Sequence, residues 1–184
     1  MDAQSIKYSC ISLQIKLLSL SLLFSVLATA QNVDTDSSKV HFSITKLGKH
    51  VVEGDFRGMT GTVVFNGKDL TSIDVCIKPE TINSGNKRRD AHLKNEDYFD
   101  VKNYPSICFQ SDSIVSVGDS VTAVGKMTML DSTRNESIAI WYSQDLVKGY
   151  LELDRFLYDL GEEGNYKIGR MVKLEIYCVL KQEE

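Results

Sequence analysis

Residues 86–105 read NKRRDAHLKNEDYFDVKNYP, and no two-residue alternation of apolar and polar side chains runs through them. The chain on both sides alternates almost everywhere, as β-strands with one buried face do. Residues 88–93 instead suit a short helix, in which Arg89 and Leu93 share one face because they are four residues apart. The sequence therefore predicts a short helical insert, at about residues 87–100, inside an otherwise β chain.

Short alternating segments flank the insert and are separated by turn signals. Asn66-Gly67 is typical of a type I′ hairpin turn, whose two central residues need positive φ. No helical stretch separates the strands at regular intervals, which argues against a parallel α/β sheet. Strands with one dry and one wet face fit an antiparallel barrel or a two-sheet sandwich. We expect an all-β fold of about eight antiparallel strands.

The inward faces of the predicted strands are rich in aromatic, aliphatic and methionine side chains. The two neighbouring inward methionines suit an adaptable apolar lining. A filled core has a similar composition, so the pattern leaves a hollow and a filled barrel open. In a hollow barrel, the residues expected to contact a ligand, including two from the insert that cover the opening, are Phe42, Phe56, Phe65, Ile77, Leu93, Phe99, Phe109, Met127, Met129, Ile140, Leu153 and Leu174.

Arg89 and His92 are the polar side chains that the insert would present at the barrel opening. One interpretation places them against the polar head of a ligand. The other is structural: Arg89 pairs with Asp90 or Asp97, and His92 binds the backbone to hold the insert in place. The sequence leaves both open, and we include Arg89 and His92 among the candidate ligand-binding residues.

No catalytic constellation accompanies these residues. The histidines, His41, His50 and His92, lack the spacing of a metal pair, and we find no nucleophile elbow or phosphate-binding loop. We therefore expect a binding protein that is not an enzyme and needs no cofactor or metal. A haem or quinone handler is a further alternative, for which His92 with Met127 or Met129 would supply the ligands.

The first thirty residues are predicted to be a secretory signal peptide. Residues 17–27 are an apolar run too short to span a bilayer, which needs about 20 residues, and Ala28-Thr29-Ala30 is a small-x-small cleavage site. We expect cleavage after Ala30, a periplasmic or secreted protein without a stable membrane anchor, and a single domain over residues 31–184.

The net charge of the chain limits the classes of molecule that it can bind. The formal net charge is −4, which makes nucleic acid a poor partner because phosphate contacts need clustered Lys and Arg.

Cys178 has the parity of a buried strand face. Cys76 and Cys108 have the outward parity of two predicted strands. The sequence does not decide whether these two cysteines form a cross-strand disulfide, which an oxidising compartment allows, or remain two free, half-exposed thiols.

The insert and its surroundings resemble the YceI-like family. The resemblance rests on N-x-x-R-D-x-H-L at residues 86–93, Y-F-D-V at 98–101 and Y-P-x-I-x-F at 104–109, and GYLELDR at 149–155 is similar to a late strand of the family. It covers residues 33–180. These motifs are specific in combination, because they join the insert to strands that lie far from it in sequence.

The resemblance implies an extended, lipocalin-like antiparallel β-barrel of eight strands. It also implies an exported protein that binds a polyisoprenoid or fatty-acyl lipid inside the barrel, commonly as a homodimer, for transport, storage or sequestration. The family brings no established catalytic residues. The alternative function is that of a filled-core barrel that acts through protein contacts, in a stress response or beside a membrane redox system.

Overall fold

The computed structural model describes residues 28–161 and 167–182. Residues 1–27, which hold most of the predicted signal peptide, lie outside the described part, as do residues 162–166 and 183–184. Within the described ranges, no helix has both the length and the apolar character needed to cross a membrane.

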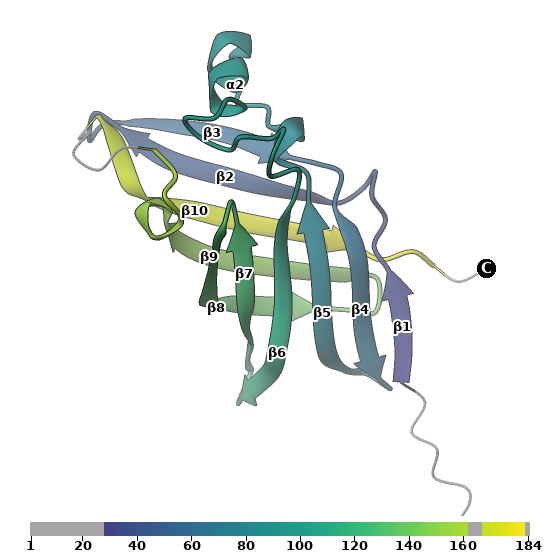
Figure 1. Ribbon diagram of the computed structural model, residues 1–184. Helices are drawn as coiled ribbons and strands as arrows, with labels where there is room; N and C mark the ends of the chain where they lie inside the picture. The colour runs from purple at the N-terminus through teal and green to yellow at the C-terminus, as the bar shows by residue number, and fades with distance from the viewer. Residues whose placement is uncertain (1–27, 162–166, 183–184) are drawn as a thin grey trace, which may run out of the picture.

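One antiparallel sheet of ten strands forms the protein (Figure 1). In sheet order the strands are β1 (Ala28–Asn32), β4 (Thr60–Asn66), β5 (Asp69–Ile77), β6 (Ile107–Val117), β7 (Ser120–Met129), β8 (Ser132–Tyr142), β9 (Leu146–Asp154), β10 (Ile168–Val179), β2 (Lys39–Lys46) and β3 (His50–Phe56). The predicted all-β antiparallel fold is confirmed, with ten strands rather than eight. β1 is a strand that alternation misses, because it is mostly exposed and is held by pairing with β4.

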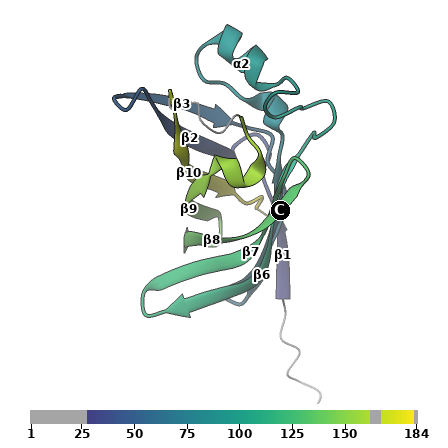
Figure 2. The ribbon, with the colours of Figure 1, turned by 60° about the vertical axis from the view of Figure 1, so that its left-hand side comes forward.

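The sheet curls into an extended, partly open barrel. Its edge strands are β1 and β3, and isolated bridges at Val33–Leu180 and Asp55–Asn83 connect their ends to other parts of the chain. Figures 1 and 2 show β4 to β7 crossing the strands β9, β10 and β2 at a steep angle. Register shifts in the pairs β4–β5, β6–β7 and β10–β2 mark bulges or irregularities, and bulges bend strands and increase their twist. The apolar faces of both halves meet in one buried core.

The two ends of the barrel differ in their connections. At the hairpin end, tight turns at residues 66–69 and 117–120 join β4 to β5 and β6 to β7. At the helix end, η1 (Pro79–Thr81) and α2 (Lys87–Leu93) connect β5 to β6, and η2 (Arg155–Tyr158) follows β9. The predicted insert is confirmed. Its helix begins after Asn86, whose side chain accepts a hydrogen bond of 3.1 Å from the Arg89 amide, as an N-cap does.

Candidate functional site

An apolar cavity of about 350 Å³ lies inside the barrel and reaches its helix end, where residues of the insert line it. This volume falls within the range of about 300–1,000 Å³ that is usual for ligand sites. Most of the predicted ligand-binding residues line it: Phe42, Phe56, Ile77, Arg89, His92, Leu93, Phe99, Phe109, Met127, Met129, Ile140, Leu153 and Leu174. Strands from both halves of the sheet and the insert therefore contribute to the lining of one space.

Phe65 is the predicted residue that lies outside this lining. It is buried at the hairpin end, where its ring centroid is 6.0 Å from that of Tyr142. Alternation correctly assigned Phe65 to the inward face of its strand. Alternation shows which face of the strand a side chain lies on, but it does not show how far along the barrel axis the side chain lies.

Three phenylalanine rings connect the insert to the barrel wall. The Phe42 and Phe56 ring centroids are 5.4 Å apart, and Phe99 meets Phe56 edge to face at 5.5 Å. A side chain at Gly54 would collide with the Phe42 ring, so the glycine makes room for this wall. Phe99 is buried and covers the cavity from the insert side, as the sequence predicted.

Ser84 holds the start of the insert in place. Arg89 donates from Nε to Ser84 Oγ and from Nη2 to the Ser84 carbonyl, each at 2.7 Å. The Asp90 carboxylate accepts from the Ser84 amide at 2.9 Å and from its hydroxyl. The structural partner of Arg89 is therefore Ser84, not the Asp90 or Asp97 that we expected. Arg89 still lines the cavity with its remaining surface.

His92 packs against an aromatic ring of the insert. Its ring meets Tyr98 edge to face, with 4.9 Å between centroids. Both residues line the cavity, and the His92 side chain is exposed to solvent. The ring contact replaces the backbone hydrogen bond that the structural interpretation assigned to His92.

Arg155 is a buried cavity residue that the sequence reasoning missed. Its guanidinium donates to the carbonyls of Gly169, Leu160 and Ile168 at 2.9, 2.6 and 3.5 Å, and it stacks 4.1 Å above the Phe156 ring. Burial lowers the pKa of the Arg155 guanidinium, because a low dielectric disfavours the charged form. A signal was present: Arg155 has the same inward parity as the leucines of β9.

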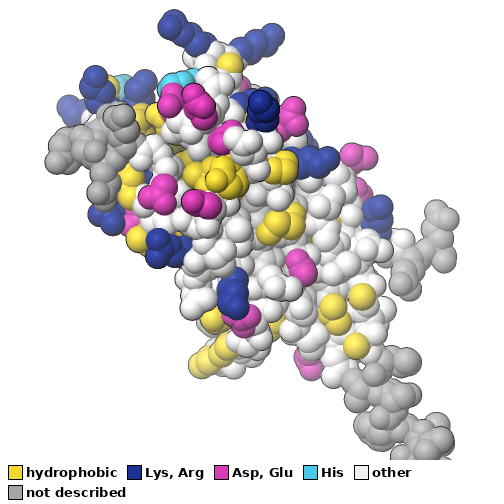
Figure 3. Space-filling view, viewed as in Figure 1, with side chains coloured by type: hydrophobic (Ala, Val, Ile, Leu, Met, Phe, Trp, Pro, Cys, Tyr) yellow, Lys and Arg dark blue, Asp and Glu magenta, His cyan; other side chains and the backbone are white. Residues whose placement is uncertain are grey.

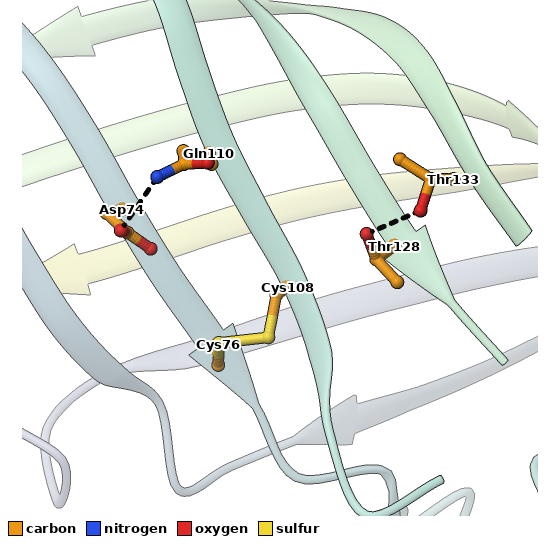
Figure 4. Close-up of a disulfide and its surroundings, with 6 residues drawn as sticks. All are labelled: Asp74, Cys76, Cys108, Gln110, Thr128 and Thr133. Carbon is orange, nitrogen blue, oxygen red and sulfur yellow. Dashed lines mark hydrogen bonds between the residues drawn. A yellow bond between two sulfur atoms is a disulfide. The ribbon is translucent and has the colours of Figure 1, made fainter. Parts of the chain in front are cut away.

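Cys76 and Cys108 form a disulfide between directly opposed residues of β5 and β6 (Figure 4). Beside it, Gln110 donates to Asp74 across the same two strands at 3.3 Å. The disulfide has the outward parity that the sequence indicated, on the same face as Asp74 and Gln110, and it joins two strands that form part of the cavity wall. Cys178 is buried, as expected, and burial raises the pKa of its thiol to about 12.

The chemistry of the cavity suits binding. In the described part of the chain, no three His, Cys, Asp or Glu side chains come close enough to hold a metal ion. The lining is dominated by aliphatic, aromatic and thioether groups, with polar groups concentrated near α2 and η2. An apolar chain placed in this space would exchange water contacts for hydrocarbon contacts, which is favourable by about 25 cal/mol per Å² of apolar surface.

Comparison with known proteins identifies relatives of the whole barrel. A family model described as the YceI-like domain matches residues 31–180. Protein YceI of Salmonella arizonae is 28% identical over 121 residues, which span 62% of this chain and 63% of that protein. The match thus covers less than two thirds of this curated relative.

Solved structures share the fold. BcnA of Burkholderia cenocepacia superposes with a TM-score of 0.70 at 21% identity, covering 81% of this chain and 99% of BcnA. A polyisoprenoid binding domain from Saccharophagus degradans, implicated in plant cell wall breakdown, superposes with a TM-score of 0.61 at 12% identity, covering 83% of this chain and 98% of the domain. At these identities the likeness establishes the barrel fold alone.

Proposed function

We propose that this chain, which belongs to the YceI-like family, is an exported binding protein that holds a long-chain amphiphile in the cavity for transport, storage or sequestration. The observation that carries the proposal is the apolar cavity of about 350 Å³. Protein interiors leave few voids larger than a water molecule. A space of this size, walled by hydrocarbon, is therefore best explained by an apolar occupant.

The energetics favour a long chain over a small apolar molecule. Each buried methylene contributes roughly 0.8 kcal/mol, whereas association costs an estimated 4–15 kcal/mol. About twelve buried carbons are needed to reach the middle of that range. A polyisoprenoid or a fatty-acyl lipid supplies them. The name of the Saccharophagus domain favours the polyisoprenoid.

Two features support export. The Cys76–Cys108 disulfide is of a kind that persists in oxidising compartments such as the periplasm. Residues 1–30 have the sequence pattern of a cleavable signal peptide. We accordingly propose a periplasmic or secreted protein. A homodimer is also an expectation from the family resemblance.

Native mass spectrometry of the mature protein, purified from its native host, tests the proposal. We expect one long-chain species bound in stoichiometric amount, which organic extraction then identifies, and the same spectrum reports the oligomeric state. A clean apo mass with no extractable lipid, from a host that makes polyprenyl lipids, would contradict the carrier function. It would favour a barrel that acts through protein contacts.

A pair of tryptophan variants separates loss of space from loss of fold. Met127→Trp places a larger side chain in the cavity, and Lys126→Trp adds the same group to the exposed face of the same strand. We expect Met127→Trp to remain folded and to lose the bound lipid, whereas Lys126→Trp retains it. A Met127→Trp protein that is destabilised by about 1–3 kcal/mol would instead indicate overpacking of a filled core.

A further inference from the structure

A second hollow, of about 480 Å³, lies beside the apolar cavity. We infer that it binds an anionic head group, a phosphate or a carboxylate, on the amphiphile whose apolar tail occupies the cavity. The inference rests on the proposed function and specifies the chemical class of the ligand. We call this second space the basic hollow, and the residues that line it are Lys46, Asn86, Arg88, Arg89 and His92.

The basic hollow and the cavity share part of their lining. Lys46, Arg89 and His92 line both spaces. They come from separate elements, since Lys46 ends β2 and the other two lie on α2. Figure 3 shows Lys and Arg side chains gathered at this end of the molecule, on α2 and beside it. A ligand with its tail in the cavity would therefore have its head among these cations.

The sign of the charge here is opposite to that of the protein. The chain carries 25 acidic and 21 basic side chains, yet in the described part of the chain no carboxylate lines either space. Two acidic groups of the insert are engaged elsewhere: Asp90 accepts from Ser84, and Asp100 accepts from Asn103. Figure 3 shows other Asp and Glu side chains at this end of the molecule, but none in the described part of the chain lines either space.

Several of these cations are available to a ligand. Among residues 28–161 and 167–182, neither Lys46 nor Arg88 has a carboxylate within ion-pair distance. The Arg89 guanidinium is oriented by Ser84 through Nε and Nη2, while its Nη1 makes no hydrogen bond in the same ranges. Phosphate and carboxylate oxygens accept short, charge-assisted hydrogen bonds from such groups, whereas an alcohol or amide head forms weaker ones.

Matched pairs of ligands test the inference. The competitors are farnesyl phosphate with farnesol, and hexadecanoate with hexadecanol, so that only the head differs within each pair. Each displaces the neutral fluorescent probe N-phenyl-1-naphthylamine from the mature protein, below the micelle concentration. We expect the anionic member to compete at about tenfold lower concentration. The difference should shrink in about 1 M salt, where the screening length falls to about 3 Å.

Charge-neutralising variants locate the effect. The triple variant Lys46→Gln/Arg88→Gln/His92→Gln removes two cations and the imidazole of the basic hollow and spares Arg89, which holds the insert. Lys68→Gln/Lys102→Gln/Lys126→Gln is the control, because these lysines are exposed and line neither space. We expect the first triple variant to bring the ratio of anionic to neutral affinity close to one and the control to retain it. Probe affinity is measured for each variant and used to normalise the ratio.

The outcomes distinguish the two proposals. Equal affinity for both members of each pair in the wild-type protein would overturn the head-group inference and leave lipid binding intact. If the first triple variant still prefers the anionic ligand, the assignment of the head-group site to the basic hollow is overturned. A wild-type protein that binds neither the probe nor any competitor would overturn the proposed function, and the head-group inference with it.

Discussion

The hairpin end and the helix end of the barrel share strands but are stabilised in different ways. At the hairpin end, Phe65, Leu70 and Ala123 are almost completely buried, and Phe65 packs against Tyr142. The cavity reaches none of these side chains. At the helix end the strands surround a space, so the side chains that face it have no protein partner on that side.

Directional interactions are concentrated where the packing is interrupted. The Cys76–Cys108 disulfide joins two strands that line the cavity, Ser84 binds both Arg89 and Asp90, and Arg155 binds three carbonyls around η2. A wall beside a void loses the dispersion contacts of its missing neighbours. Covalent and hydrogen-bonded links can keep such a wall in shape without filling the space. A hollow barrel can therefore be rigid at the end that stays open to a ligand.

The largest expected effect follows from a matched pair of phenylalanines. Phe65 and Phe109 are 4% and 5% exposed, but only Phe109 lines the cavity. We expect Phe65→Ala to lower the free energy of unfolding by about 3–5 kcal/mol. Phe109→Ala should cost less, because part of its ring already borders a void. Denaturant unfolding followed by circular dichroism measures both. Equal losses would mean that the two ends are packed alike.

A second expected effect concerns the covalent link at the helix end. Cys76 and Cys108 are 32 residues apart in sequence and enclose the whole insert. Replacing both with Ala should lower the free energy of unfolding by about 2–4 kcal/mol, since the unfolded chain gains the entropy of an open loop. Added reductant should destabilise the wild-type protein by a similar amount and leave the double variant unchanged. If reductant leaves the free energy of unfolding of the wild-type protein unchanged, the disulfide does not have this stabilising role.

For the strands that it detected, alternation in the sequence was sufficient to predict which face is buried. Phe42, Met127 and Cys178 all face inward as the pattern indicates, because a strand that buries one face must repeat every second residue. The insert was predictable for the complementary reason: it breaks the alternation. These are local properties of the chain, and short windows of sequence report them.

The cavity and its polar neighbours were harder to predict, because they depend on long-range geometry. Whether a barrel is hollow depends on side-chain volumes summed at one level across strands distant in sequence, which is why Phe65 was placed at the wrong depth. β1 (Ala28–Asn32) was missed because residues 28–30 were assigned to the cleavage site of the signal peptide, and because its pairing with β4 has no apolar signature. Arg155 shows inward parity, but its carbonyl partners are Leu160, which follows η2, and two residues of β10, and no spacing rule connects them.

The smallest expected effect is a pH dependence confined to the helix end. Asp154, at the end of β9, accepts from Arg170 Nε at 2.7 Å and from the Phe156 amide at 3.2 Å. Its hydrogen bond with Arg170 lowers the pKa of the Asp154 carboxyl below its ordinary value of 3.8. The resulting stabilisation is fully present above pH 3.8 and is lost as the pH falls through the lower folded value. Because Arg170 is largely exposed, we expect this stabilisation to be less than about 1 kcal/mol.

Asp154→Asn isolates this contribution. At neutral pH the variant should be less stable than the wild type by a few tenths of a kcal/mol, and the difference should vanish once the pH is below the folded-state pKa of the wild-type carboxyl, where that carboxyl is also protonated. Asp119→Asn is the control at the hairpin end. Asp119 lies in the exposed β6–β7 turn, where its carboxylate has no hydrogen bond or ion pair within the described residues. If Asp154→Asn remains less stable than the wild type in acid, the carboxyl acts there through its shape or its neutral hydrogen bonds. The directional interactions of the helix end would then be no more sensitive to acid than the packing of the hairpin end.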